Sequence, residues 1–301
     1  MRKIALLPAD DKDKDKIRKE KSSKTLRRLL TLLTKAEHNV CICIPTSARG
    51  VTEEAVKITA SGADVDVMYF DGTPPADIEF AIVLGGDGCM LHASHDFCGI
   101  PLLGVNLGRI GYIAEIEADE LELIERALTG DYRIEERMML TAQIERDGKI
   151  IWRSGAALND IVVSHGTLSR MASIEISCGE GEPERYYADG IIFATPTGST
   201  AYSMSAGGPI VDPSIDCICV TPICPHSLLT RPMIFSAENI IFCRAAEDCR
   251  SELFITVDGS ENVQLMKTDI VRIKRSDVRT KLVRVKNCGF RSVFRKKLAR
   301  P

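Results

Sequence analysis

The chain has 301 residues, a formal net charge of −3 at pH 7, 27% charged residues and 45% hydrophobic residues. This length is enough for two ordinary hydrophobic cores, so we expect two domains. The slightly acidic balance argues against non-specific binding to nucleic acid, which requires a basic surface. No apolar run reaches the length of a membrane span, and residues 1–8 are too short for the apolar part of a signal peptide. We therefore expect a cytoplasmic protein with no membrane partner.

Strands and helices alternate over the first third of the sequence. Residues 3–7 form an apolar strand pattern, and the alternating Asp and Lys residues at 10–16 indicate a solvated loop. Leucines at helical spacing then predict a helix over residues 17–37. The next predicted elements are strands at 40–44, 65–70 and 78–84 and a helix at 52–61. This alternation is typical of a parallel sheet covered by helices.

A glycine-rich turn follows the strand predicted at 78–84. Its sequence is Gly85-Gly86-Asp87-Gly88, in which three glycines surround one carboxylate. Such glycines permit positive φ and leave amides unhindered for phosphate oxygens, although a tight turn whose aspartate bonds its own backbone is the alternative. The turn lies at the carboxyl end of a strand, where ligands of parallel sheets gather, and a short helix at 89–95 would direct N–H groups toward an anion.

From residue 132 onward the pattern changes to short strands. They are predicted at 139–146, 149–152, 161–163, 172–178, 191–194, 217–220, 240–243, 253–257 and 270–274. A helix capped by Asp119 and followed by Gly130 would join the two parts. The fold class is therefore an α/β N-terminal domain with a parallel sheet flanked by helices, plus a β-rich C-terminal domain. We place the domains at 1–118, to which the basic amphipathic segment 288–301 returns, and at 119–287.

A long block of small, hydroxyl-bearing residues follows the strand at 191–194. It begins Thr195-Pro196-Thr197-Gly198-Ser199-Thr200-Ala201-Tyr202 and extends to Pro209. A hydrophobic core has little use for such residues, whereas small side chains, hydroxyls and free N–H groups suit a polar ligand such as a nucleotide. Asn159 and Asp160 place an amide and a carboxylate together at the start of another strand; a capping or turn role is the alternative.

The eleven cysteines suggest reduced thiols rather than disulfides. Cys217, Cys219, Cys224 and His226 fall within ten residues, as metal ligands often do. Residues 217–220, however, read as a buried strand in which Cys217 and Cys219 share one face as small hydrophobic side chains. We favour the core role over a zinc site, and the same role for Cys41 and Cys43.

Taken together, these motifs resemble the NAD kinase family. The resemblance rests on the turn at 85–88, Asn159-Asp160, Asp189-Gly190 and the block at 195–202, together with residues 106–112 and 225–228, and it covers residues 82–260. The turn alone is also similar to those of diacylglycerol, sphingosine and phosphofructo-kinases. In this range Gly104, Gly108 and Gly111 have the wrong spacing for a dinucleotide-binding fingerprint, so we expect them to serve turns and close approaches.

The resemblance implies the reaction and the partners. It implies transfer of a phosphoryl group from ATP to the 2′-hydroxyl of the adenosine ribose of NAD, which gives NADP; polyphosphate is an open alternative donor. A divalent cation, Mg or Mn, would arrive with ATP. The family also implies a homodimer or homotetramer whose pockets borrow residues from a neighbouring subunit.

The residue roles follow from this resemblance and from the chemistry. Asp87 is the candidate base for the hydroxyl proton, and Gly85, Gly86 and Gly88 would cradle the donor phosphates. The residues expected to contact NAD are Asp87, Gly88, His92, Asn159, Asp160, Arg170, Tyr187, Asp189, Thr200, Ala201, Tyr202, Ser203, Met204, Ser205 and Cys224. The family commonly has Glu where this chain has the shorter Asp160. For Arg170 and His92, plain surface or core positions are the alternatives, and His226 is expected to organise its loop.

Two other functions share part of this pattern. A nucleotide-binding regulator would keep the pocket without transferring phosphate, but it would be expected to lack Asp87, which is present. A lipid or sugar kinase shares the glycine-rich turn and is distinguished by offering NAD or diacylglycerol with radiolabelled ATP.

Overall fold

The structure is a computed structural model that describes residues 2–8, 16–34, 39–50, 52–53, 56, 66–108, 111–166, 171–179 and 181–298. The chain divides into two compact units. Unit 1 comprises Met1–Glu136 and Thr280–Pro301, and unit 2 comprises Arg137–Arg279. The domain boundaries expected from the sequence are 118/119 and 287/288, whereas the units meet at 136/137 and 279/280. The units differ from the expected domains because Leu121, Ile124 and Val283 are buried in the core of unit 1.

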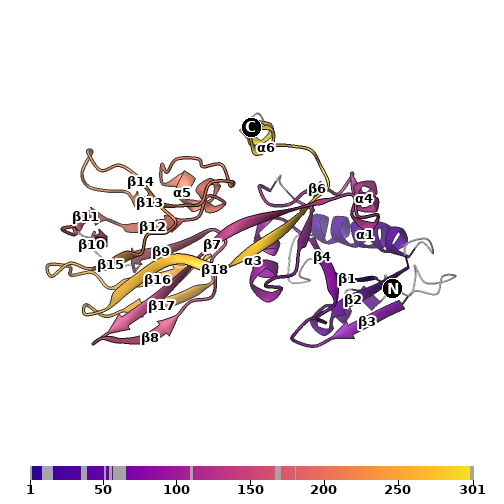
Figure 1. The fold of residues 1–301 in the computed structure, drawn as a ribbon, viewed down its shortest axis with the longest axis horizontal. Coiled ribbons are helices and arrows are strands. Elements are labelled where there is room, and N and C mark those ends of the chain that lie inside the picture. The colour runs from indigo at the N-terminus through magenta and orange to yellow at the C-terminus, as the bar shows by residue number, and fades with distance from the viewer. Residues whose placement is uncertain are drawn as a thin grey trace. The chain divides into compact units, whose positions relative to one another are not determined.

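Unit 1 contains a parallel sheet, as predicted (Figure 1). The strand order is β18-β5-β4-β1-β2-β3, and β6 pairs with β5. The strands are β1 (Arg2–Leu7), β2 (Val40–Pro45), β3 (Asp66–Phe70), β4 (Ile78–Leu84), β5 (Leu102–Asn106), β6 (Ile116–Glu117) and the C-terminal end of β18 (Ile270–Arg284). The helices are α1 (Lys16–Leu33), η2 (Thr46–Ala48), α3 (Asp87–Asp96), η3 (Leu121–Leu123), α4 (Ile124–Leu128) and α6 (Phe290–Leu298).

Helices α1 and α4 pack on one face of this sheet. The leucines that predict α1 are all buried, and they join alternate side chains of the strands in one core. The other face is closed by α3, where Met90 lies against Gly104 of β5. A Cβ on Gly104 would lie 2.7 Å from the sulfur of Met90, so the expected role of this glycine in a close approach is confirmed. Only Thr52, Glu53 and Val56 of the helix predicted at 52–61 are described, and they are helical; the rest lies outside the described residues.

The helix predicted from Asp119 to Gly130 differs at its start. It begins as η3 with Glu120 at the N-cap position, and no side chain caps it; Asp119 as the cap is therefore wrong. The Glu120 carboxylate instead accepts a hydrogen bond of 3.0 Å from the N–H of Glu117. Gly130 has φ of 82° just after α4, as its predicted position beyond the helix requires.

The order of the strands gives unit 1 a topological switch point. The chain continues from β1 to β2 and β3 on one side and then crosses to β4 and β5 on the other. In open parallel sheets, ligands bind beyond the carboxyl ends of the two strands that flank such a reversal. Here those strands are β1 and β4, and residues 85–88 directly follow β4. The glycine-rich turn therefore lies where this topology places a ligand.

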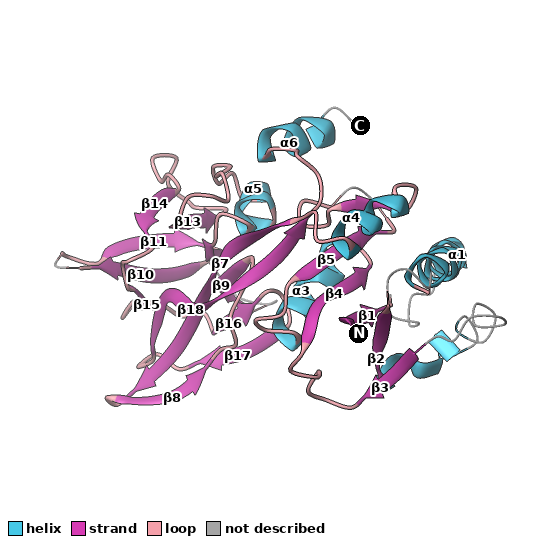
Figure 2. Cartoon of the chain, turned by 45° about the vertical axis from the view of Figure 1, so that its right-hand side comes forward, coloured by secondary structure: helices cyan, strands magenta, loops and turns pink. Residues whose placement is uncertain are grey.

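Unit 2 is mostly strand, as predicted (Figure 2). One sheet has the antiparallel order β14-β13-β12-β9-β16-β17, and the second contains β7, β8, β10, β11, β15 and β18. Alternate apolar side chains from both sheets form one core. The strands are β7 (Arg133–Arg146), β8 (Lys149–Arg153), β9 (Asp160–His165), β10 (Ala172–Cys178), β11 (Glu184–Ala188), β12 (Gly190–Ala194), β13 (Cys217–Ile223), β14 (Met233–Ser236), β15 (Ile241–Ala245), β16 (Leu253–Val257) and β17 (Glu261–Leu265).

The outer face of the six-stranded sheet is also covered. Ile192 of β12, Cys217 and Cys219 of β13, and Val211 form a second small core there. This confirms the predicted core role of the two cysteines; Cys41 and Cys43 are buried in β2 in the same way. The segment between β12 and β13 carries η4 (Gly198–Thr200) and α5 (Tyr202–Ser205), and it provides part of this cover. Among the described residues, no helix is long and apolar enough to cross a membrane.

Candidate functional site

Asp87 is the first residue of α3, two positions before the predicted start of this helix. Its carboxylate accepts hydrogen bonds from two consecutive backbone N–H groups, those of Tyr112 at 2.5 Å and Ile113 at 3.0 Å. A negative charge is also favourable in the first turn of a helix because the helix dipole is positive there. The two hydrogen bonds fix the orientation of the carboxylate and leave further lone pairs on both oxygens for a ligand hydroxyl.

Glycines allow this arrangement at two places. An added Cβ on Gly111 would lie 2.1 Å from Oδ1 of Asp87, so any side chain there would displace the carboxylate. Gly85 has φ of 156°, and a Cβ there would lie 2.3 Å from the sulfur of Cys89. Gly86 and Gly88 meet nothing within 4 Å. In the first turn of α3, the N–H groups of Cys89 and Met90 both donate to the carbonyl of Gly86, at 3.0 and 3.2 Å. The glycines on either side of Asp87 leave the backbone at the helix start without side chains, which is the arrangement expected of a phosphate site.

The threonine and serine hydroxyls of the 195–203 block are used within the protein. Thr195, Thr197, Ser199, Thr200 and Ser203 are all buried. The hydroxyl of Thr195 donates to the carbonyl of Leu158, those of Ser199 and Thr200 donate to carbonyls within the block, and that of Ser203 pairs with Thr221. The argument that a core has little use for such residues is therefore wrong, because this block covers the sheet with its own hydroxyls satisfied.

The ligand-accessible part of the block is narrower than predicted. Tyr202 and Ser205 are exposed, and Ala201 and Met204 are half-buried. Thr200 and Ser203 are buried, with their hydroxyls bonded to the protein. The exposed part of the predicted wall is therefore limited to one face of α5 and the residue before it. Tyr202 is 47% exposed, so its ring is free to stack on a flat ligand.

Asn159 and Asp160 lie directly against this block. The N–H of Thr195 donates to the carbonyl of Asn159 at 2.8 Å, and a Cβ on Gly198 would lie 2.0 Å from that same carbonyl oxygen. The N–H of Gly198 in turn donates to the hydroxyl of Thr195 at 3.0 Å. These contacts join two motifs, more than thirty residues apart in the sequence, into one rigid pair of loops. Position 198 has room only for a glycine.

Asp258 holds this loop pair from a third segment and was not identified in the sequence. Its carboxylate accepts three consecutive backbone N–H groups, from Leu158 at 2.7 Å, Asn159 at 2.8 Å and Asp160 at 3.0 Å. Its own N–H donates to the carbonyl of Asp160 at 2.9 Å. Asp258 has φ of 47°, in the left-handed region that aspartate tolerates better than most residues. The Asp258-Gly259 pair, typical of a turn, is the only local signal of this role.

Asp160 is 6% exposed, so its carboxyl group has little access to solvent. Burial and the neighbouring charge of Asp258 raise its pKa from 3.8 to about 7. A carboxyl group in this position is partly protonated at neutral pH and then donates as well as accepts a hydrogen bond. Asp160 is shorter than the Glu that is common in the family, and its carboxyl group is also partly protonated at neutral pH.

A second group of predicted residues gathers at Asp189. The N–H of Asp189 donates to the carbonyl of Ile223, next to Cys224, and the N–H of His226 donates to the carbonyl of Tyr187. His165, which the sequence analysis did not identify, lies with Nε2 3.3 Å from Oδ1 of Asp189. Cys224 is exposed with φ of 44°, and Tyr187 is also exposed. The loop at 225–228 is thus organised by its backbone.

The structure does not bring Asp160 and Asp189 together. In the β9–β12 pair, Asp160 lies opposite Ala194, whereas Asp189 precedes Gly190, which lies opposite Ser164 at the other end. At roughly 3.4 Å per residue, the two groups are about 17 Å apart along the strands. Unit 2 therefore presents two separate groups of candidate ligands.

The remaining predicted site residues have simpler positions. His92 is exposed on α3, in agreement with the solvent alternative, and Arg170 lies outside the described residues. In the described part of the chain, no three His, Cys, Asp or Glu side chains are placed to hold a metal ion.

Replacing Asp258 by alanine should strongly destabilise unit 2. Three backbone N–H groups, at partly or fully buried residues, would lose their acceptor, and we expect the free energy of unfolding to fall by about 2–4 kcal/mol. Asp147→Ala is the matched control, because Asp147 also has left-handed φ, of 50°, but lies exposed in the β7–β8 turn. Denaturant unfolding measures both variants; equal losses would show that backbone conformation, not the three hydrogen bonds, sets the cost.

The pKa of Asp160 makes stability depend on pH. The folded chain retains a proton that the unfolded chain releases above pH 3.8, so stability should fall as pH rises from about 4 to about 7. Asp160→Asn should remove this slope and be more stable than the parent at pH 8 by up to about 4 kcal/mol. Unfolding curves at several pH values test this, with Asp147→Asn as the control at an exposed carboxylate. An unchanged slope in Asp160→Asn would contradict it.

Comparisons with known proteins agree with these motifs. The profile of the ATP-NAD kinase N-terminal domain matches residues 13–132, and that of the ATP-NAD kinase C-terminal domain matches residues 158–285. An NAD kinase of Symbiobacterium thermophilum is 43% identical over 78% of this chain and 83% of its own length. An NAD kinase of Natranaerobius thermophilus is 35% identical over 99% of this chain and 98% of its own.

Solved structures show the same fold. The yeast NADH kinase complexed with NADH superposes with a TM-score of 0.80 at 23% identity, covering 100% of this chain and 88% of that one. An NAD kinase from Archaeoglobus fulgidus in complex with ATP has a TM-score of 0.66 at 24% identity and covers 99% of both chains. The sequence matches, which extend over both units, show that this chain belongs to the NAD kinase family.

Proposed function

We propose that this chain phosphorylates the 2′-hydroxyl of the adenosine ribose of NAD, with ATP as the donor, to give NADP. The observation that carries the proposal is the Asp87 carboxylate, held by two backbone N–H groups at the first turn of α3 and at the switch point of a parallel sheet. The family membership and the relatives named NAD kinase support the same reaction.

Phosphoryl transfer demands positioning more than strong basicity. The transition state is loose in most analyses, and the protein contributes mainly by orienting the acceptor and by stabilising charge on the phosphate oxygens. In this proposal Asp87 orients the ribose hydroxyl and accepts its proton late in the transfer. Gly85, Gly86 and Gly88 and the N–H groups at the start of α3 bind the donor phosphates. The divalent cation, Mg or Mn, is part of the substrate and arrives bound to ATP.

The residues of unit 2 are proposed to bind the dinucleotide. Asn159 and Asp160 offer an amide and a partly protonated carboxyl group to its hydroxyls, and the exposed face of α5 with Tyr202 offers a stacking surface. Asp189, Tyr187 and Cys224 form the second group of contacts. We retain Thr200, Ala201, Ser203, Met204, Ser205 and His92 as proposed contacts, those with bonded hydroxyls through their backbone.

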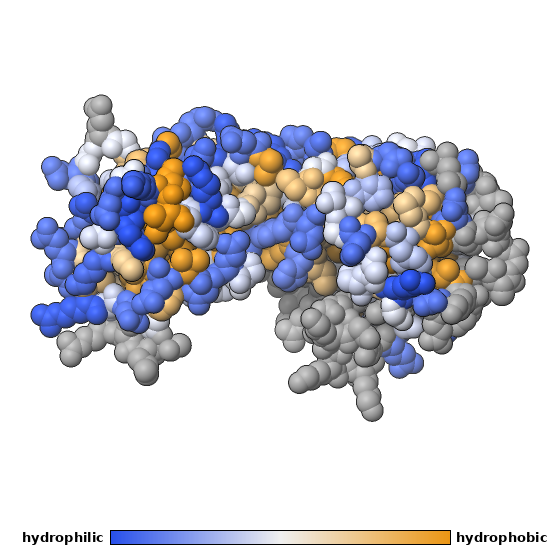
Figure 3. Space-filling model, turned by 90° about the horizontal axis from the view of Figure 1, so that it is seen from below, coloured by the Kyte–Doolittle hydropathy of each residue, from blue (hydrophilic) through white to orange (hydrophobic). Residues whose placement is uncertain are grey.

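We also propose that the protein is a cytoplasmic homo-oligomer, a dimer or tetramer. Two observations support the oligomer. Large apolar side chains are exposed in unit 2, among them Leu228 at 90% and Leu229 at 86%, and Figure 3 shows one face of the molecule on which hydrophobic residues gather between hydrophilic ones. The separation of Asp189 from Asp160 also fits pockets that borrow residues from a neighbouring subunit. Light scattering of the purified protein measures the mass of the assembly, and a monomer would contradict this part of the proposal.

One assay tests the reaction directly. The purified protein should form NADP from NAD and ATP in the presence of Mg²⁺. Parallel reactions replace ATP by polyphosphate, NAD by NADH, and NAD by diacylglycerol with radiolabelled ATP. Absence of NADP in every arm, or label in a lipid product, would refute the proposed function, whereas the polyphosphate and NADH arms define the donor and acceptor range.

Asp87→Asn should retain NAD binding and lose most turnover. The amide keeps the size of the side chain but cannot accept a proton, and loss of a general base typically costs about 10²–10⁴-fold. Calorimetric titration measures NAD binding, and initial rates give kcat. Asp96→Asn, on the exposed end of the same helix, is the control and should keep the parent rate. A fully active Asp87→Asn protein would show that the base is another group.

A further inference from the structure

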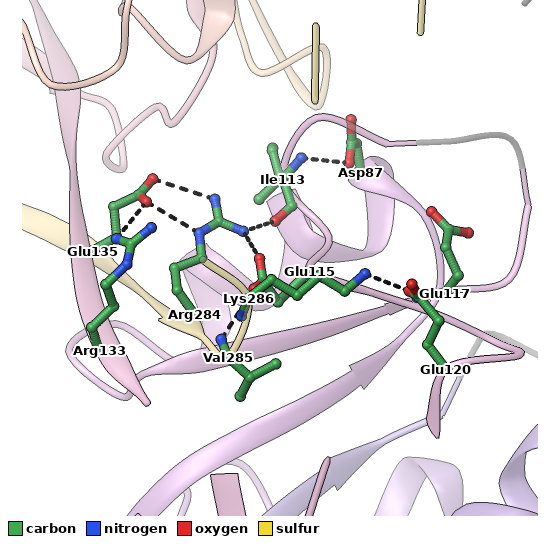
Figure 4. A network of polar contacts seen from close by, with 10 residues as sticks. All are labelled: Asp87, Ile113, Glu115, Glu117, Glu120, Arg133, Glu135, Arg284, Val285 and Lys286. Carbon is green, nitrogen blue, oxygen red and sulfur yellow. Dashed lines mark hydrogen bonds and ion pairs between the residues drawn. The ribbon is translucent and has the colours of Figure 1, made fainter. Parts of the chain in front are cut away.

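An arginine from the far end of the chain lies behind the loop that holds Asp87. Arg284, the last residue of β18, is 8% exposed, and its Nη1 donates to the carbonyl of Ile113 at 2.9 Å. The N–H of the same residue, Ile113, donates to Oδ1 of Asp87 at 3.0 Å. Residue 113 therefore connects the guanidinium to the carboxylate through its own backbone, as Figure 4 shows.

The guanidinium is itself held on three sides. Its Nη1 also donates to Glu115 at 3.0 Å, and its Nε and Nη2 each donate to Glu135 at 3.3 Å. A planar fork with several fixed donors is specific to arginine, since a lysine ammonium concentrates its donors at one point. Arg284 thus fixes the carbonyl of Ile113 relative to two glutamates on different segments of unit 1.

Glu115 extends this arrangement to the chain that carries Arg284. Its Oε1 accepts the N–H of Val285 at 3.0 Å and that of Lys286 at 2.7 Å. Lys286 in turn pairs with Glu120. The carboxylates around the buried guanidinium are therefore themselves hydrogen-bonded, as a buried charge requires.

The loop before Ile113 is closely packed as well. Gly111 has no room for a Cβ beside Asp87, and Tyr112 bonds the second carboxylate oxygen. Among the described residues, the aromatic ring of Tyr112 lies 6.2 Å from that of Phe294 on α6. The position of the two N–H groups is thus set by the backbone of residues 111–113, and Arg284 donates a hydrogen bond to that backbone from a distant part of the sequence.

We propose that Arg284 is a positioning residue for phosphoryl transfer, which orients Asp87 through the backbone of Ile113. The inference rests on the proposed role of Asp87 as the base. Arg284 does not contact a substrate in this account. Its contribution is to keep the peptide N–H groups of residues 112 and 113 where they hold the carboxylate, and a misplacement of about 1 Å of a reacting group can cost about 10²-fold in rate.

The test compares Arg284→Met with Arg2→Met. Arg2 is a matched control in unit 1, because it pairs with Glu79 and also reaches the carbonyl of Ala127, but does not contact the loop at 111–113. We expect Arg284→Met to lower kcat by about 10–100-fold with little change in KM for NAD, and Arg2→Met to keep the parent kcat. Hydrogen exchange should accelerate at the amides of residues 112 and 113 in Arg284→Met alone.

Two further variants separate the possible failures. In the Asp87→Asn background, Arg284→Met should cause no further loss, because both changes act on one group. Arg284→Lys keeps the charge but not the fork and should fall between the parent and Arg284→Met; it also decides the test if Arg284→Met does not fold. Parent-like kcat and exchange in a folded Arg284 variant, or a loss that adds fully to Asp87→Asn, would overturn the inference. An active Asp87→Asn protein would refute the base assignment, whatever the Arg284 variants do.

Discussion

The candidate site of each unit depends on the same type of interaction: a carboxylate accepts hydrogen bonds from consecutive backbone N–H groups. In unit 1, Asp87 accepts two, from residues 112 and 113. In unit 2, Asp258 accepts three, from residues 158–160. Because several backbone N–H groups bonded to one anion fix a loop strongly, both candidate sites consist of loops held in place rather than of long side chains reaching into solvent.

The two carboxylates have different consequences. The Asp258 carboxylate accepts three backbone N–H groups and lies beside Asp160, so its charge contributes to the raised pKa of that residue. Asp258 therefore acts on the candidate ligand Asp160 in two ways: it fixes the backbone there by a hydrogen bond, and its charge raises the pKa of the Asp160 carboxyl group. Asp87 and Asp258 are both half-buried, so exposure does not distinguish them. Asp87 accepts one backbone N–H on each oxygen and keeps further lone pairs, which its proposed role as the base requires.

Much of the fold could be predicted from the sequence, because central strands are continuous apolar runs. No range was predicted for β5, β6, β11, β14 and β17. Of these, β11, β14 and β17 lie at the ends of their sheets, where a strand has one neighbour, and β6 is two residues long. β11 and β17 carry polar residues and lack an apolar run, whereas β14 is only four residues long. The motif residues could be predicted because glycines and a lone acid are unusual after a strand. The supporting residues could not, since Asp258 and Arg284 act on residues 99 and 171 positions away and carry no local pattern that reveals this.

The hydroxyl-rich block shows why composition alone misjudged the site. Its sequence suits a polar ligand, but tertiary packing uses the hydroxyls of Thr195, Ser199 and Ser203 to satisfy buried groups. A ligand that meets this segment would therefore meet backbone and the small, exposed side chains of α5, in a frame that is already rigid. A rigid site lowers the entropic cost of binding, because few side chains have to be ordered when the ligand binds. The chemistry of such a site would then depend on backbone geometry. Gly111 and Gly198 have no room for a Cβ, so a side chain at either position would displace Asp87 or the backbone of Asn159.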